Sequence, residues 1–479
     1  MADNFINIIR LNKNGPASLV QQLTAQMRKM IVSGQLPEGF ALPSSRHLAK
    51  TLGISRNTVT SAIDQLTAEG FLVTSQGRRP TVAAAFTRPK SSRAIGSRQH
   101  SRPPNLSLWA SHIRADSWPP QNEKRPLPFR PGVSDERLFP HDIWARCLRR
   151  ASRAQSALSD RALNHPPLRA ALRNHLATHR GTRSDAERIF IVPTAQTGFA
   201  LIAKLIVNPG DLCWVESPGY GGAIAALNAT GAKIKGIPLD RQGLVLDPRQ
   251  PAPKLIFTTP AHQNPTGRLM SIGRRLDLIR FAAANDAWII EDDYDGEYHY
   301  EGNPIPSLQG LDENNRTFYV GTFSKSTCAD IRLGYVIVPP TLVDVFGKAQ
   351  RHFGALAPRY MQIALAEFMR DGHYLAHVRR TRRIYHARRD CLADAVERHL
   401  PELLSVEIPA GGMQLVAWIN GAADDTATSI CLQNAGITTR AISPMFSCGA
   451  RRDGLFLGFA GWNEREIEKT VRKMANAIG

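Results

Sequence analysis

Three short apolar runs, each followed at once by polar side chains, constrain the fold of this sequence most. From about residue 126 onward, strand-like patterns alternate with helical ones, which predicts an α/β domain built around a largely parallel sheet. The three runs cover residues 255–259, 288–290 and 318–323. Ligands of such sheets bind beyond the carboxyl ends of the strands, so the side chains that follow these runs are the candidates for a binding site.

The residues after the three runs have complementary chemistry. Asn264 follows the first run, Asp292 and Tyr294 follow the second, and Lys325 follows the third with Arg332 seven residues downstream. A lysine amine condenses with the aldehyde of pyridoxal phosphate (PLP), a carboxylate keeps the pyridine nitrogen protonated, and phenol and amide groups bond the ring's 3-oxygen. The set predicts a PLP site in which Lys325 forms the Schiff base.

These residues resemble the cofactor set of fold-type I aminotransferases, and the resemblance covers most of residues 126–479. It implies an α/β domain with a smaller C-terminal α+β subdomain. It also implies that Asp292 pairs with the pyridinium nitrogen and that Asn264 and Tyr294 bond the 3-oxygen. Tyr220 would stack on the ring. The groups implied for the phosphate are Thr322, Ser324, Arg332 and the backbone amides of Ala195 and Gln196, where a helix begins near Thr194.

Taken singly, three of these residues also fit a purely structural role. Tyr220 fits a core aromatic, Asp292 a strand-end cap or ion-pair partner, and Arg332 a surface charge. The order of the whole set at successive strand ends favours the cofactor site.

Two positions depart from the aminotransferase pattern. Residues 454–459 resemble a segment that usually reads L-R-L-G-F, whose arginine binds a substrate α-carboxylate as a bidentate fork, but this chain has Phe456 there. Thr194 stands at the phosphate turn where glycine is usual. A carboxylate beside Phe456 would lose a charge-assisted contact. We therefore expect the ligand to be an amine without an α-carboxylate, PLP itself, or an amino compound whose acid group reaches Arg440 or Arg451.

The first 82 residues predict a small basic DNA-binding domain. They carry nine Lys and Arg against four Asp and Glu, a net charge of +5. Apolar residues recur at helical spacing from Ser18, and Gly34 closes that helix. A second helix starts at Ser44 and stops at Gly53, and a third starts with Ser55 as its N-cap. A helix, a glycine turn and a helix with exposed polar residues at its start match a helix-turn-helix.

The segment that follows predicts a β-wing. Residues 71–74 and 81–83 form the hairpin, with a turn at Gly77 and with Arg78 near the DNA phosphates. Together with residues 39–59, this pattern resembles the signature of GntR-type winged helix-turn-helix regulators over most of residues 16–83; the alternative is a merely solvated helix face. The resemblance implies DNA contacts from Arg46, Arg56, Asn57 and Thr58. The geometry of the third helix adds Ser55 and Thr60.

A stretch rich in Pro, Ser and Arg separates the two predicted domains. A flexible chain of about 42 residues, the length of this stretch, has a root-mean-square reach of roughly 35 Å, which is enough to cross to a partner subunit. The expected organisation is a winged helix over residues 1–83, a linker over 84–125 and an effector domain over 126–479. The whole chain has a net charge of +19 and a pI near 10.1, which favours binding to polyanions.

A GntR-type domain, a linker and an aminotransferase-like domain together resemble the MocR subfamily of bacterial transcription regulators. The resemblance implies a homodimer that binds double-stranded operator DNA and senses PLP, or an amino compound as its PLP aldimine, without acting as an enzyme. An active aminotransferase with an accessory DNA-binding domain is the alternative. A third interpretation is a cofactor-free domain that serves only for dimerisation.

Composition excludes several other classes. The longest apolar run is shorter than the roughly 18 residues of a membrane span, and the first residues lack the pattern of a signal peptide. The six cysteines are scattered, without the paired spacing of a zinc site or a disulfide framework. We expect a cytoplasmic protein, nucleoid-associated when it binds DNA, with no metal and no membrane partner.

Overall fold

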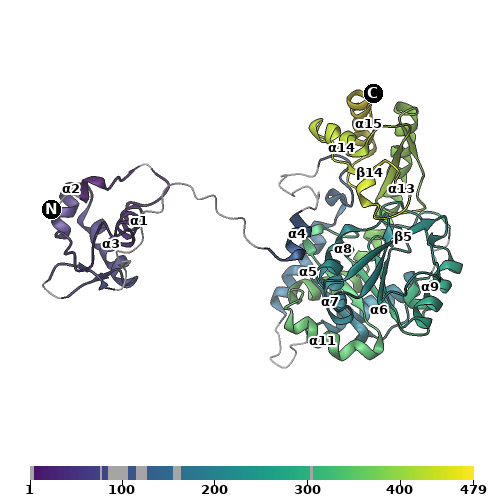
Figure 1. The fold of residues 1–479 in the computed structure, drawn as a ribbon, viewed down its shortest axis with the longest axis horizontal. Coiled ribbons are helices and arrows are strands. Elements are labelled where there is room, and N and C mark those ends of the chain that lie inside the picture. The colour runs from purple at the N-terminus through teal and green to yellow at the C-terminus, as the bar shows by residue number, and fades with distance from the viewer. Residues whose placement is uncertain are drawn as a thin grey trace. The chain divides into compact units, whose positions relative to one another are not determined.

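The computed structural model describes residues 5–13, 15–75, 78–84, 106–114, 127–154, 163–302 and 306–479. The chain divides into two compact units, Met1–Pro104 and Asn105–Gly479 (Figure 1). Each unit has its own hydrophobic core.

The first unit contains three helices and a short hairpin. Its elements are a 3-10 turn η1 (Ile6–Ile8), α1 (Leu19–Val32), α2 (Ser45–Leu52), α3 (Arg56–Ala68), β1 (Leu72–Val73) and β2 (Thr81–Val82). The apolar faces of the helices meet in one core that includes Leu23, Met27, Val59 and Leu66. The predicted order of three helices and a wing is confirmed.

Capping residues explain where these helices begin and end. Ser18 and Gln21 form a capping box at the start of α1, and Ser44 accepts a hydrogen bond from the amide of His47 at the start of α2. Gly53 ends α2 with φ of +65°, a left-handed conformation that glycine adopts without strain. The tight turn between α2 and α3 therefore depends on that glycine.

The wing is antiparallel. Leu72 pairs with Val82 and Val73 with Thr81, and Ala41 forms an additional bridge to Thr81. The predicted turn residue Gly77 lies outside the described residues.

The predicted linker contains a helix that its composition did not indicate. This helix, α4 (Leu108–Arg114), belongs to the second unit, where it packs on α8 (Gly221–Asn228), and the indole Nε1 of Trp109 donates to the carbonyl of Ala225 at 3.2 Å. Trp109 and Ile113 are four residues apart and share one helix face. Apart from α4 and its immediate neighbours, most of residues 84–125 lie outside the described ranges.

The larger domain of the second unit is built on an eight-stranded sheet with the order β3-β10-β9-β8-β7-β4-β5-β6. The strands are β3 (Ile189–Val192), β4 (Leu212–Ser217), β5 (Lys233–Asp240), β6 (Gly243–Leu244), β7 (Leu255–Thr258), β8 (Trp288–Asp293), β9 (Thr317–Thr322) and β10 (Gly334–Ile337). The five strands from β9 to β5 are parallel, whereas β10 is antiparallel to both neighbours and β6 to β5. The expectation of a largely parallel sheet holds for the centre.

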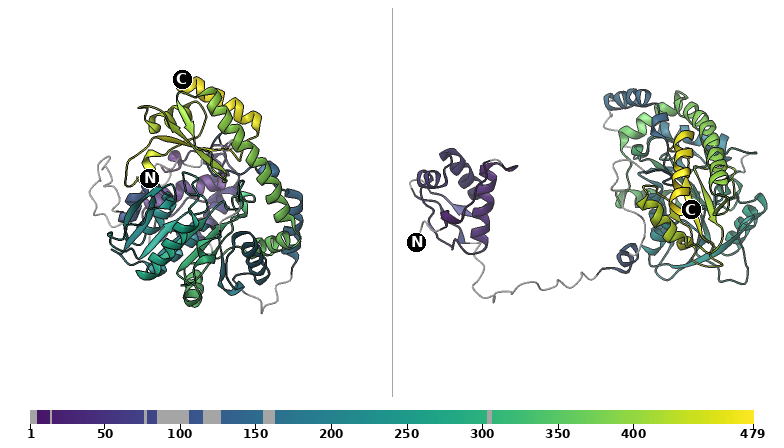
Figure 2. Two further views of the ribbon diagram at one scale, coloured as in Figure 1. Left: turned by 90° about the vertical axis from the view of Figure 1, so that its right-hand side faces the viewer. Right: turned by 90° about the horizontal axis from the view of Figure 1, so that it is seen from above.

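Helices cover both faces of this sheet (Figures 1 and 2). They are α5 (His141–Arg153), α6 (Pro166–Arg180), α7 (Ala195–Ile206), α8, α9 (Ile272–Ala284), α10 (Leu308–Leu311), α11 (Val343–His352) and α12 (Arg359–Arg370). Successive strand residues point to opposite faces: Phe257 packs with α7 and α8, while Ile256 packs with α9. Burial on both faces explains why these strands read as continuous apolar runs.

The smaller subdomain has its own antiparallel sheet. Its order is β11-β12-β14-β13, formed by β11 (Leu404–Val406), β12 (Gln414–Ile419), β13 (Arg440–Ala441) and β14 (Gly454–Gly458). Its helices are α13 (His373–His399), α14 (Asp425–Asn434) and α15 (Glu464–Ile478), and α13 also contacts α12 of the larger domain (Figure 2). Single 3-10 turns occur at Glu136–Leu138, Ala186–Arg188, Ala329–Ile331, Pro340–Leu342 and Ser443–Met445.

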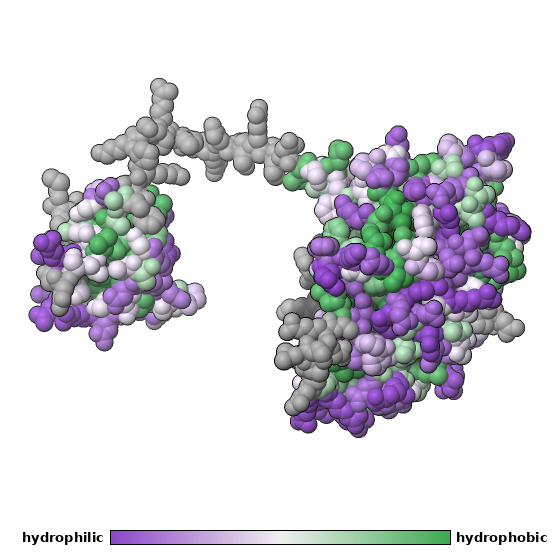
Figure 3. All heavy atoms as spheres, turned by 90° about the horizontal axis from the view of Figure 1, so that it is seen from below, coloured by the Kyte–Doolittle hydropathy of each residue, from purple (hydrophilic) through white to green (hydrophobic). Residues whose placement is uncertain are grey.

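Hydrophilic residues dominate the face of both units that Figure 3 shows, with a narrow apolar strip on the larger one. In the described ranges, no helix has both the length and the apolar character that spanning a membrane requires.

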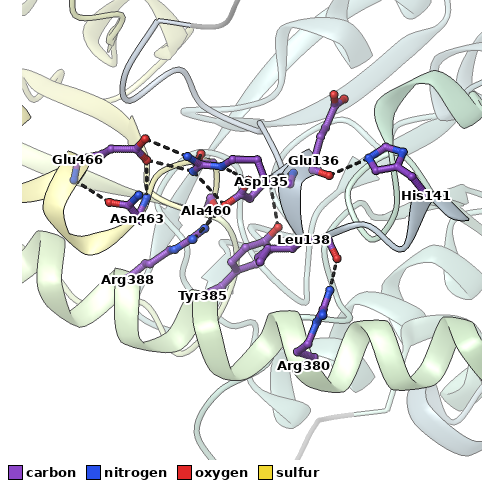
Figure 4. Close-up of polar contacts among 12 residues, drawn as sticks. Asp135, Glu136, Leu138, His141, Arg380, Tyr385, Arg388, Ala460, Asn463 and Glu466 are labelled. Atoms are coloured by element: carbon purple, nitrogen blue, oxygen red, sulfur yellow. Dashed lines mark hydrogen bonds and ion pairs between the residues drawn. The ribbon is translucent and has the colours of Figure 1, made fainter.

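A buried ion pair joins the start of the larger domain to α13. The guanidinium of Arg388 donates to the Asp135 carboxylate at 2.9 Å and to the carbonyl of Ala460 at 2.6 Å, and both charged side chains are buried (Figure 4). Arg137 donates to the same carboxylate at 2.7 Å and also pairs with Glu466. Burial alone would raise the pKa of Asp135, but the two arginines outweigh it and lower that pKa. The cluster therefore fixes the segment that precedes Asp135.

Replacing Arg388 with Met should lower the free energy of unfolding of the second unit by about 3 kcal/mol, because a buried carboxylate loses a partner. The matched control is the exposed Arg380, which donates from α13 to the carbonyl of Leu138. Arg380→Met should change the free energy of unfolding by less than about 1 kcal/mol. All seven tryptophans lie beyond residue 104, so tryptophan fluorescence during urea unfolding reports this unit. Equal losses in both variants would contradict the assignment.

Candidate functional site

The carboxyl ends of β7, β8 and β9 lie side by side in the parallel part of the sheet and border a cavity of about 290 Å³. Nine of the ten residues predicted to bind the cofactor line it: Ala195, Gln196, Tyr220, Asn264, Asp292, Tyr294, Thr322, Ser324 and Lys325. The structure thus brings together residues that are up to 130 positions apart in the sequence.

The amine of Lys325 lies inside this cavity. Its Nζ donates to the carbonyl of Gly132 at 2.6 Å. The φ of Gly132 is +72°, which favours glycine, and a Cβ atom there would lie 2.7 Å from that Nζ, so the end of the lysine side chain would have to shift. Burial lowers the pKa of Lys325, although the carboxylates of Asp295 and Asp292 act in the opposite direction. A lower pKa makes more of the neutral, nucleophilic amine available near neutral pH.

Asp292 provides the carboxylate that a pyridine nitrogen would need. It is buried, and its Oδ1 has no hydrogen-bond partner among the residues that the structure describes. Burial raises the pKa of Asp292 well above its ordinary value, and the neighbouring carboxylates Asp293, Asp295 and Glu216 raise it further. A cationic N–H group is what this oxygen lacks, because it would supply both a donor and a compensating charge. The site therefore fits a protonated pyridine ring.

Two tyrosines and two side-chain amides complete the ring pocket. The Nε2 of Gln414 reaches the hydroxyl of Tyr294 at 3.5 Å, Asn264 also hydrogen-bonds to Tyr294, and burial raises the pKa of this phenol well above its ordinary value. Burial, with the charge of Asp292, raises the pKa of Tyr220 to about 12. Both phenols therefore stay protonated and can donate hydrogen bonds.

The predicted phosphate end lies at the start of α7. The hydroxyl of Thr194 accepts from the amide of Thr197 at 3.1 Å, and the two preceding helix residues, Ala195 and Gln196, line the cavity. With φ of −153°, Thr194 has extended backbone that any residue adopts, so the turn does not need the usual glycine. A helix N-terminus of this kind favours an anion. The hydroxyl of Thr322 accepts from the amide of Ser324.

Arg332 differs from the other nine. It is exposed, has a left-handed φ of +46°, and does not line the cavity. Its role in phosphate binding stays a prediction.

Several cavity residues had not been predicted from the sequence. Arg130, Gly132, Gln414, Thr438 and Thr439 also line it. They come from the segment before α5 and from the smaller subdomain, neither of which carries the strand-end pattern that identified the others. The one local signal is the Pro131-Gly132 pair, a dipeptide typical of turns, and in the structure both residues lie in a turn where Gly132 has positive φ.

Two buried acidic groups behind the cavity were also missed. Glu216, at the end of β4, accepts from both hydroxyls of Thr258 and Thr259 at 2.6 Å and thereby ties β4 to β7. Asp295 contacts the Nδ1 of His262 at 3.1 Å and shares a water-sized space with Lys325. Glu216 lies four residues before Tyr220 and Asp295 directly follows Tyr294, so their closeness in sequence to predicted site residues was the available signal.

The three residues connected with ligand recognition in the sequence differ in whether they line the cavity. Phe456 is buried and lines the cavity. Arg440 is half-buried and also lines it, whereas Arg451 is exposed and does not line it. Of the two arginines named from the sequence, only Arg440 is placed to reach a ligand.

The second candidate site is the DNA-binding surface of the first unit. Most of the residues predicted to contact DNA are exposed: Arg46, Ser55, Arg56, Asn57, Thr60 and Arg78. Thr58 is half-buried, and its hydroxyl lies 2.8 Å from that of Ser55, which caps α3. Ser55, Arg56, Asn57 and Thr60 lie at the start of α3, the part of a recognition helix that enters the major groove. Arg46 lies on α2 and Arg78 next to the wing strand β2. Their contacts with DNA stay predictions.

Comparison with known families agrees with both domains. Residues 19–82 match the family of bacterial regulatory proteins of the gntR type, and residues 139–473 match aminotransferase class I and II. The fold and the two matches together define a DNA-binding regulator with an aminotransferase-like domain. The chain belongs to the MocR subfamily of GntR-type transcription regulators.

Similar proteins cover nearly the whole chain. A probable rhizopine catabolism regulatory protein MocR of Rhizobium meliloti is 34% identical over 98% of this chain and 95% of its own length. A pyridoxine biosynthesis transcriptional regulator PdxR of Corynebacterium glutamicum is 29% identical over 98% of both. Among solved structures, a kynurenine aminotransferase of Pyrococcus horikoshii, in complex with PMP, matches with a TM-score of 0.67 and 26% identity over 74% of this chain and 90% of its own.

The pH titration of Lys325 tests the electrostatics of the cavity. In cofactor-free protein whose lysines carry 13C-methyl groups, NMR should show Lys325 losing its proton below the usual pH of about 10.4, because burial lowers its pKa. Asp295→Asn should move the midpoint lower still, since that carboxylate raises it. Asp330→Asn, an exposed carboxylate outside the cavity, is the control. A Lys325 midpoint equal to that of the bulk lysine signals would contradict this account.

Proposed function

We propose that this protein is a PLP-dependent transcription regulator that binds operator DNA and whose DNA binding responds to PLP or to an amino compound held on it. The observation that carries the proposal is the buried Asp292 Oδ1, which has no hydrogen-bond partner among the described residues, on a residue that lines the same cavity as Lys325, in a chain that also has a winged helix-turn-helix. The names of the relatives MocR and PdxR support a regulatory role.

In the proposed complex, each residue of the cavity has a distinct role. Lys325 holds the cofactor aldehyde, Asp292 keeps the ring nitrogen protonated, and Tyr294 with Asn264 bonds the ring oxygen. Tyr220 covers the ring. The phosphate lies at the start of α7. When bound, PLP supplies the electrophile that captures a primary amine, so the cavity is suited to recognise amino compounds as a class.

The proposal extends to assembly and location. We expect a cytoplasmic homodimer, associated with the nucleoid when it binds DNA. Two copies of the winged helix would then read two operator half-sites.

An active aminotransferase is the second candidate, because the set that lines the cavity includes both the lysine and the carboxylate that such catalysis needs. Steady-state conversion of an amino donor and a keto acid would support it. Capture of an amine without continued turnover would support the regulator.

The deciding experiment compares three forms of the protein on a DNA fragment that it selects from a random pool. Affinity and bending should differ among the cofactor-free, PLP-loaded and amine-treated forms, because a ligand shifts a DNA equilibrium by as much as it distinguishes the two states. Lys325→Ala should bind the fragment without responding to PLP or amine. Borohydride reduction and mass spectrometry should place the PLP adduct on Lys325. Identical binding by all three forms would refute the sensing role.

Two arginines of the first unit should have different effects on DNA binding. Arg56→Ala should reduce discrimination between specific and random DNA by about 1–3 kcal/mol, because it lies at the start of the recognition helix. Arg78→Ala, on the wing, should weaken binding to all sequences and lower the salt dependence by about one counterion. Binding isotherms at several salt concentrations separate the two effects. Unchanged affinities in both variants would argue against a winged-helix reader here.

A further inference from the structure

We infer that Arg440 binds the acid group of an amino-acid ligand and thereby replaces, from the neighbouring strand, the arginine that is absent at Phe456. The inference rests on the proposed function, because it concerns the same cavity. It goes further by naming the ligand class and the residue that selects it.

Strand register brings Arg440 to the position of the missing group. β13 pairs with β14 in antiparallel register, and Arg440 lies directly opposite Phe456. Side chains of directly opposed residues project from the same face of a sheet with Cβ atoms about 5 Å apart. Both residues line the cavity. A guanidinium that starts at Arg440 can therefore occupy space that an arginine at position 456 would otherwise reach.

The far end of Arg440 lies beside the proposed ring pocket. Its Nη2 is 3.7 Å from the place that a Cβ atom on Gly221 would occupy, at the first residue of α8. Its charge acts on the hydroxyl of Tyr220 and opposes the rise in the pKa of that phenol. The positive charge therefore lies next to the residue predicted to cover the cofactor ring, where a ligand joined to that cofactor would extend.

The apolar surroundings of Phe456 also favour Arg440 as the residue that binds the acid group. Phe456 packs with Val416, Trp418, Ile442 and Met445 in an apolar cluster. A carboxylate placed against that cluster would lose hydration without gaining a partner. Arg440 supplies a partner for it, and Thr438, whose buried hydroxyl has no hydrogen-bond partner among the described residues, also lines the cavity. An amino acid fits this wall better than a purely apolar amine.

Two other arginines are the rivals. Arg451 is exposed and does not line the cavity. Arg130 does line it, but it lies two residues before Gly132, whose carbonyl accepts from the Lys325 amine, so it belongs to the segment beside the lysine. An acid group bound by Arg130 would remain close to the reacting amine.

The test is a spectral titration of the PLP-loaded protein with α-amino acids, ω-amino acids and simple amines that lack an acid group. Arg440→Gln should weaken the apparent affinity for the responsive amino acids about 10- to 100-fold, as expected when a charge-assisted pair is lost. Its affinity for simple amines should not change. Arg451→Gln, a matched loss of an exposed arginine, should leave both classes unaffected.

Two further variants distinguish the possible outcomes. Arg440→Gln combined with Phe456→Arg should recover amino-acid binding, because it returns the guanidinium to the adjacent strand; this recovery also shows that the loss did not arise from misfolding. Thermal unfolding shifts on adding each ligand give a second readout that does not depend on the cofactor spectrum.

The results separate this inference from the proposed function. A wild type that responds to amino acids, with Arg440→Gln responding equally, overturns the role of Arg440 alone. A loss in Arg130→Gln with none in Arg440→Gln assigns the acid group to Arg130 and also overturns it. A wild type that responds to no amino compound at all overturns the inference and the amine-sensing part of the proposed function, whereas the DNA-binding comparison of cofactor-free and PLP-loaded protein tests the PLP-sensing part separately.

Discussion

The burial of several carboxylates around one amine is the constraint on which the second unit depends. Asp293 has Arg180 at 2.6 Å, Asp295 has His262 at 3.1 Å, and Glu216 accepts hydrogen bonds from Thr258 and Thr259. Among the described residues, Asp292 Oδ1, Asp293 Oδ1 and Asp295 Oδ2 are all buried without a hydrogen-bond partner, but of these three residues only Asp292 lines the cavity. Burying charge without compensation is costly, so the ion pairs and hydrogen bonds of the other carboxylates hold the strand ends in place, and Asp292, which faces the cavity, marks where a cationic ligand belongs.

Local signals explain why so much of the first unit could be predicted. Ser18, Ser44 and Ser55 are caps that act within three residues, and Gly53 acts through its own φ angle. Neither depends on distant parts of the chain. The helix α4 was not predicted from the sequence, for the opposite reason. Its seven residues lie in a stretch dominated by Pro, Ser and Arg, and its position depends on packing against α8, which composition cannot reveal.

The residues that line the cavity also fall into two groups, those that local sequence could predict and those that depend on tertiary packing. Asn264, Asp292 and Lys325 could be predicted because each follows a strand of a parallel sheet, where adjacent carboxyl ends must meet. Gly132 and Gln414 could not, since their approach depends on how the smaller subdomain packs on the larger domain. The choice between Arg440 and Arg451 likewise needed the pairing of β13 with β14, because residues 440 and 456 are related only through strand register.

The chain between the two units bears on how a ligand could alter DNA binding. A ligand in the cavity affects the winged helix only through a difference in free energy between two states of the whole protein. Within one chain, residues 85–126 are the only covalent connection between the wing and the larger domain. Its described helix, α4, packs on α8, and α8 begins directly after Tyr220. A ligand that shifted Tyr220 would therefore act directly on α8, the helix on which α4 of the connecting segment packs.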